Sequence, residues 1–178
     1  MLVASRRNGL PAYPLKPKLE AVLREVAAGN PVLVFQNLSL PIYPVWHYAV
    51  VIGFDRNRNT LILHSGRTPR LEMSLATFER TWARGDYWSM VALAPGRLPA
   101  TAEPDGYAQS VAALERVNPK SAQTAYAAAL KKWPTHRALL FGSGNAAYAL
   151  GQLPAAAGAY RATVQAHPEF ADGWNNLA

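Results

Sequence analysis

The sequence contains no cysteine. This absence excludes disulfide bonds, thiolate metal sites and a cysteine nucleophile within these 178 residues. Long apolar runs are missing as well: none approaches the roughly 20 residues that a membrane-spanning helix requires, so we expect no transmembrane segment. The N-terminal residues 1–9 lack the order of a secretory signal, in which charge precedes a long apolar stretch.

Acidic residues are also scarce, with 11 Asp and Glu against 18 Lys and Arg, which gives a net charge of +7. The basic residues are scattered, and only Arg6-Arg7 and Lys131-Lys132 are adjacent pairs. A nucleic-acid-binding protein normally gathers basic residues on one face with aromatic residues between them. We therefore attribute the charge to solubility and to affinity for acidic surfaces, and expect no nucleic-acid partner. The four histidines show no metal-ligand spacing, so neither a metal nor another cofactor is expected.

Half of the residues are hydrophobic, which is enough for a packed core. Residues 18–28 predict an amphipathic helix, with Leu19 and Val22 on its apolar side and Glu20 and Glu25 facing outward. A second helix is expected at 75–84, capped by Ser74. Short apolar runs at 32–36, 45–55, 60–63, 70–73 and 87–93 predict strands. The first half is therefore expected to be α+β with a mostly antiparallel sheet.

The strand predicted at 45–55 carries His47 near its start, where a fold can hold an imidazole against a cleft. A lone histidine at such a position is more often structural than catalytic. Gln36 ends the neighbouring predicted strand, and we expect it to line the same cleft together with Trp46 and Ser65. Position alone therefore leaves both a structural and a catalytic role open for His47.

Four segments, in this order, carry a resemblance to a known family: Gly29 to Val34, His47 to Asp55, Leu61 to Gly66, and Ser74 to Trp82. They resemble the papain-like cysteine peptidases that cut double-glycine leaders from bacteriocin precursors, and their stand-alone bacterial relatives. The resemblance covers residues 1–97, as the C-terminal portion of such a domain. It implies a Cys-His-Asp or Cys-His-Asn mechanism, in which a thiolate attacks the peptide carbonyl and the third residue orients the imidazole. It also suggests a bacterial envelope location, in the periplasm or as an outer-membrane lipoprotein.

Of the family's catalytic residues only His47 carries over, as general base and acid. The cysteine and the oxyanion glutamine would precede Met1, and Gln36 falls after the cysteine position. The third member would lie at the end of the second hairpin strand, where His64 stands before Ser65, and an imidazole cannot stabilise an imidazolium as a carboxylate does. Asp55 lies at the opposite end of the strand from His47. We therefore expect this chain alone not to hydrolyse peptides, and a non-catalytic peptide-binding module remains the alternative.

Residues 98–104 have the composition of a linker, and the alanine-rich residues 105–178 predict helices. Three residues recur at an offset of 34, which is the tetratricopeptide period: Ala122, Tyr126 and Pro134 return as Ala156, Tyr160 and Pro168. This second half resembles tetratricopeptide repeats. Each such repeat is a helix pair that buries its face only against stacked neighbours, and Gly144 falls where the two helices should cross.

The resemblance implies a concave groove that binds a peptide or protein ligand, and Asn145, Tyr148 and Asn175 are our candidates to face it. We expect Tyr126, Tyr160 and Trp174 to serve inter-helix packing instead. The sequence ends inside the first helix of a repeat, which reads as a truncation. Trp174 is therefore expected to be exposed or to be covered by a neighbouring molecule through self-association.

Overall fold

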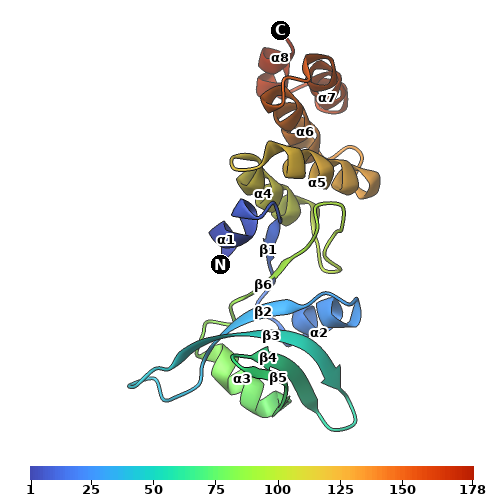
Figure 1. Ribbon diagram of the computed structural model, residues 1–178. Coiled ribbons are helices and arrows are strands. Elements are labelled where there is room, and N and C mark those ends of the chain that lie inside the picture. Colours follow the sequence, from blue (N-terminus) through green and yellow to red (C-terminus); the bar gives the residue numbers. More distant parts are fainter. The chain divides into compact units, whose positions relative to one another are not determined.

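Figure 1 shows the computed structural model, which describes all residues, 1–178. The chain forms two compact units. The helical unit comprises Met1–Ala12, Ala92–Leu98 and Ala102–Ala178, and the sheet unit comprises Tyr13–Val91 and Pro99–Thr101. We expected residues 1–97 to form the peptidase-like part, whereas the contacts of Met1–Ala12 lie with the helical unit.

The sheet has six strands in the order β1-β6-β2-β3-β4-β5. The pairs β2–β3, β2–β6, β3–β4 and β4–β5 are all antiparallel. β5 lies at an edge of the sheet. The α+β class with a largely antiparallel sheet is therefore confirmed. The strand bounds are β1 Ala12–Pro14, β2 Val32–Asn37, β3 Trp46–Asp55, β4 Thr60–Ser65, β5 Thr68–Ser74 and β6 Ser89–Ala92.

The core of the sheet unit includes one face of the three central strands, on which alternate residues are buried: Val32, Val34, Ala49, Val51, Leu61 and Leu63. α3 (Leu75–Ala83) contacts β2, β4 and β5, and it buries Phe78 and Trp82. The Oγ of Ser74 accepts a hydrogen bond from the Thr77 N–H, so Ser74 is the N-cap that the sequence predicted. α2 (Leu19–Ala27) contacts β2 and β3.

Glu25 of α2 does not face outward as expected, because its side chain is fully buried. Its carboxylate accepts hydrogen bonds from the Asn30 amide, from the Ala100 and Thr101 N–H groups and from the Thr101 hydroxyl. A buried carboxylate is tolerated when donors surround it in this way. Glu25 thus fastens part of the segment expected to be a linker, Pro99–Thr101, to the sheet unit.

The helical unit is a succession of helices in which each of α4 to α8 contacts the next, and α4 also contacts α6 (Figure 1). Tyr126 and Tyr160 are buried, as predicted, and Trp174 is exposed, which is one of the two outcomes expected for it at the end of the sequence. None of the helices is both long and apolar enough to span a membrane. The helix bounds are α1 Leu2–Arg7, α4 Pro104–Glu115, α5 Pro119–Lys132, α6 Arg137–Ala149, α7 Leu153–Ala166 and α8 Ala171–Leu177.

Candidate functional site

His47 lies at the second position of β3, between β2 and β4. It stands opposite Gln36 of β2, and its neighbour on the same face, Ala49, stands opposite Ser65 of β4. His47 Nε2 and Ser65 Oγ share a hydrogen bond of 2.8 Å. This bond holds the imidazole by one ring nitrogen and leaves Nδ1 as the nitrogen that could meet a reaction partner. The structure therefore brings two of the predicted site residues together.

His64 does not approach His47. It stands opposite Val50, so it lies on the other face of the sheet, and its side chain is exposed. Successive residues of a strand point to opposite faces, and for this reason Ser65 rather than His64 contacts His47. The signal was present in the sequence, because Ser65 continues the alternation of the buried residues Leu61 and Leu63.

Gln36 and Trp46 do not line an open cleft beside His47. Gln36 is buried, and its Nε2 donates a 2.6 Å hydrogen bond to Thr81 Oγ1 in α3, while its Oε1 has no hydrogen-bond partner. Trp46 points to the face opposite His47, because adjacent strand residues alternate. Its ring is exposed and stacks on Phe35, with centroids 5.1 Å apart.

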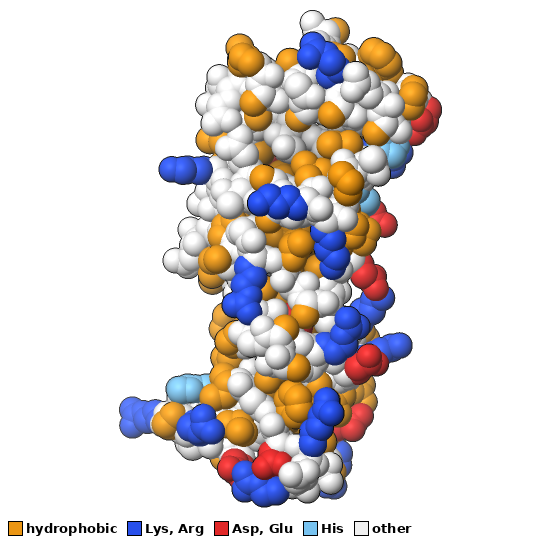
Figure 2. Space-filling model, turned by 90° about the vertical axis from the view of Figure 1, so that its right-hand side faces the viewer, with side chains coloured by type: hydrophobic (Ala, Val, Ile, Leu, Met, Phe, Trp, Pro, Cys, Tyr) orange, Lys and Arg blue, Asp and Glu red, His pale blue; other side chains and the backbone are white.

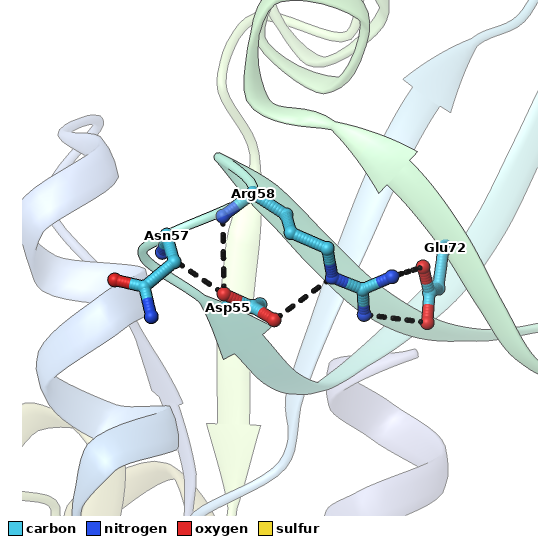
Figure 3. A network of polar contacts seen from close by, with 4 residues as sticks. All are labelled: Asp55, Asn57, Arg58 and Glu72. Carbon is cyan, nitrogen blue, oxygen red and sulfur yellow. Dashed lines mark hydrogen bonds and ion pairs between the residues drawn. The ribbon is translucent and has the colours of Figure 1, made fainter.

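Asp55 serves the turn between β3 and β4, as Figure 3 shows. Its Oδ1 accepts hydrogen bonds from the Asn57 and Arg58 N–H groups, and its Oδ2 accepts one from Arg58 Nε. The bonds from Arg58 lower the pKa of the Asp55 carboxyl. Arg58 also pairs with Glu72 of β5, so the network ties the β3–β4 turn to β5. These contacts give Asp55 a structural role far along the strand from His47.

The three groove candidates of the helical unit line one pocket. Asn145, Tyr148 and Asn175 surround a volume of about 430 Å³ together with Tyr160 and Asn176, and we call this set the asparagine pocket. The Tyr160 hydroxyl donates a 2.9 Å hydrogen bond to Asn145 Oδ1, which orients the amide so that its NH₂ group remains to donate. No charged side chain lines this pocket.

A second pocket of about 360 Å³ shares Asn145 with the asparagine pocket and extends past Phe141 toward α4. Here the Tyr126 hydroxyl donates a 2.9 Å hydrogen bond to the Glu115 carboxylate. Partial burial raises the pKa of Glu115, and burial beside Glu115 raises the pKa of Tyr126. The two pockets thus adjoin each other at Asn145 of α6.

Two other kinds of site find no support. No group of three or more His, Asp or Glu side chains could hold a metal ion. The basic side chains in Figure 2 are scattered over the face shown and are not gathered into a stripe. A nucleic-acid interface would require such a stripe.

Comparison with known families identifies the second half of the chain. Residues 107–178 match the tetratricopeptide repeat family. This match confirms the repeats that the 34-residue offset predicted. Tetratricopeptide repeats are protein-interaction modules, in which stacked helix pairs present an extended concave surface.

A solved structure of a C39-like peptidase from Bacillus anthracis is similar to this chain, with 16% sequence identity and a TM-score of 0.40. The similarity covers 46% of this chain and 50% of that chain, so this chain spans about half the length of that relative. A likeness of this strength carries no argument about the site around His47. Comparison with curated proteins yields no match.

Proposed function

We propose that the helical unit binds an extended peptide segment of a partner protein, and that the asparagine pocket holds the peptide backbone. The carrying observation is that Asn145, Asn175 and Asn176 converge on one pocket within the tetratricopeptide repeats. An asparagine amide can donate to a backbone carbonyl and accept from a backbone N–H at once. Tyr148, of which 65% is exposed, adds an apolar ring for an aliphatic or aromatic side chain. Because the pocket carries no charge, the binding depends little on ionic strength.

Screening immobilised random dodecapeptides against the 178-residue chain tests this proposal. Asn175→Ala and Tyr148→Ala should weaken the selected peptides roughly tenfold or more, since pocket residues dominate binding energy. Leu153→Ala is the matched control, because Leu153 is exposed on α7 and lines neither pocket. Equal affinities for the pocket variants and the control would contradict the proposal.

We propose as a second function that the sheet unit supplies the histidine of a papain-like cysteine-peptidase site of the leader-processing type. The hydrogen bond between His47 Nε2 and Ser65 Oγ favours this role, because a catalytic imidazole must be oriented by one nitrogen while the other serves the nucleophile. Ser65 is neutral, so it orients the ring but stabilises an imidazolium less than a carboxylate would. The nucleophilic thiol would have to come from outside these residues. The alternative is that the same surface binds a peptide without cutting it.

Two measurements test the second function. The 178-residue chain should not hydrolyse fluorogenic peptides that end in double glycine, since it has no thiol; turnover that disappears in His47→Ala would contradict this. In NMR spectra, Ser65→Ala should change the ¹⁵N shift of His47 Nε2, whereas His64→Ala should leave it unchanged. A response to His64→Ala alone would exclude Ser65 as the positioning residue.

A further inference from the structure

The connection between β2 and β3 exposes an unusual amount of apolar surface. No Lys, Arg, Asp or Glu occurs between Glu25 and Asp55. Within this stretch, residues 38–46, which we call the apolar loop, extend beyond the strands (Figure 1). Ile42 and Tyr43 are each 76% exposed at its tip, and other large hydrophobic side chains are exposed around them: Leu38, Leu40, Val45 and Trp46. A contiguous exposed apolar patch of this kind marks an interaction site.

Part of the backbone of the apolar loop is hydrogen-bonded within the structure. Asn37 Oδ1 accepts from the N–H groups of Ser39 and Val45, at 3.0 and 2.9 Å. The N–H groups of Leu38 and Tyr43 donate to the carbonyls of Val45 and Leu40. Pro41 and Pro44 have no N–H to satisfy. The N–H groups of Leu40 and Ile42 and the carbonyls of residues 41–44, at the tip, have no partner within the structure.

This arrangement suits a lipid environment. Unsatisfied backbone groups keep loops out of the hydrocarbon core of a membrane. The free groups at the tip therefore restrict the loop to the interfacial region, where water and lipid headgroups can pair with them. Tyr43 and Trp46 are residue types that favour the membrane–water interface. Arg84 Nη1 donates a 2.8 Å hydrogen bond to the Ser39 carbonyl, which places a cation at the foot of the loop. The net charge of +7 complements an anionic lipid surface.

A protein partner fits the apolar loop less well. Protein interfaces carry about one hydrogen bond per 100–200 Å², and the side chains of residues 38–46 offer only the Ser39, Tyr43 and Trp46 polar groups. We propose that the apolar loop inserts into the interfacial region of an anionic phospholipid membrane, with Ile42 and Tyr43 entering first. This inference is independent of both proposed functions, because it uses no residue of the His47 pair or of the asparagine pocket.

Co-sedimentation of the 178-residue chain with vesicles of phosphatidylglycerol and phosphatidylcholine tests the proposal. The chain should bind vesicles that contain phosphatidylglycerol. Ile42→Glu should lower its partition coefficient roughly tenfold or more, because a charge replaces an aliphatic side chain that enters the membrane. Tyr43→Ser provides a second, milder variant. Leu153→Glu introduces the same charge at an exposed position of α7 and should leave binding unchanged. Circular dichroism checks that each variant is folded.

The depth of insertion gives an independent readout. Brominated lipids should quench part of the tryptophan fluorescence, and Trp46→Phe should remove that quenched part. The proposal is overturned if the chain fails to bind anionic vesicles, if Ile42→Glu and Tyr43→Ser bind as the unchanged chain does, or if Trp46 is not quenched. Self-association without vesicle binding, lost in Ile42→Glu, would assign the apolar loop to a protein interface and also overturn it.

Discussion

The pleat of the sheet places Ser65 beside His47. The register that sets Ala49 opposite Ser65 brings the hydroxyl to 2.8 Å from Nε2, and a slip of one residue would present His64 instead. The buried residues Leu61 and Leu63 hold that register, because a slip would expose them. The sequence indicated His64 as the candidate partner of His47, whereas the next residue, Ser65, makes the contact.

Glu25 is the residue on which we expect the stability of the sheet unit to depend most visibly. Glu25→Ala leaves the donors of Asn30, Ala100 and Thr101 without their acceptor, so the free energy of unfolding should fall by roughly 3 kcal/mol or more. Glu20→Ala changes an exposed carboxylate on the same helix and should stay within about 0.5 kcal/mol. Urea unfolding measures both, and equal losses would show that the carboxylate contacts contribute nothing.

At the scale of whole elements, the helices approach closely where glycine meets tyrosine. A Cβ added to Gly144 would clash with the Tyr160 ring, and one added to Gly142 would clash with the Tyr126 ring. Both tyrosines are buried and hydrogen-bonded, to Asn145 and Glu115 respectively, so the rings cannot withdraw freely. The small residue that the repeat pattern places at 144 thus permits the helix crossing.

Gly144→Ala should therefore destabilise the helical unit by about 1–3 kcal/mol through overpacking. Gly158→Ala is the matched control within α7, because nothing lies within 4 Å of the added methyl group. The control should gain about 0.5–1 kcal/mol from helix propensity. Thermal unfolding followed by circular dichroism separates the two, and a gain in both variants would refute the close packing.

The helical unit should also be sensitive to alkaline pH. Burial raises the pKa of Tyr107 to about 12, and burial beside Glu115 raises that of Tyr126 as well. Because the folded pKa values exceed the unfolded value of about 10, their contribution is complete below pH 10 and is lost as pH rises through 12. Tyr107→Phe should move the alkaline transition to higher pH, whereas Tyr148→Phe, at an exposed ring, should not. A pH titration of circular dichroism and tyrosinate absorbance decides this.

For the molecule as a whole, the net charge of +7 is dispersed, as Figure 2 shows for one face. Such a distribution gives weak, non-specific attraction to polyanions without a track for a nucleic-acid backbone. We expect Kd values weaker than about 10⁻⁶ M for duplex DNA and single-stranded RNA at physiological salt. Fluorescence anisotropy measures them, and tighter, sequence-dependent binding would contradict the expectation.

The elements of both units could be predicted from local pattern. Short apolar runs identified the strands, the 3.6-residue stripe identified α2, and the 34-residue offset identified the repeats. These signals are local because they follow from the geometry of a single element or of one repeat. The same reasoning selected Asn145, Tyr148 and Asn175, which share a pocket because the repeat fixes the position of each on its helix.

The sequence by itself thus determined the α+β class, the antiparallel sheet and the helical repeats. Only the tertiary structure decided that Ser65 contacts His47, that Glu25 is buried and that Trp46 lies on the other face of the sheet. The physical reason is that each of these depends on strand register or on donors distant in sequence, such as Thr101 for Glu25. The exposure of the apolar loop was also decided only by the tertiary structure. Its hydrophobic composition alone predicts burial, and only the packing shows that these side chains are exposed.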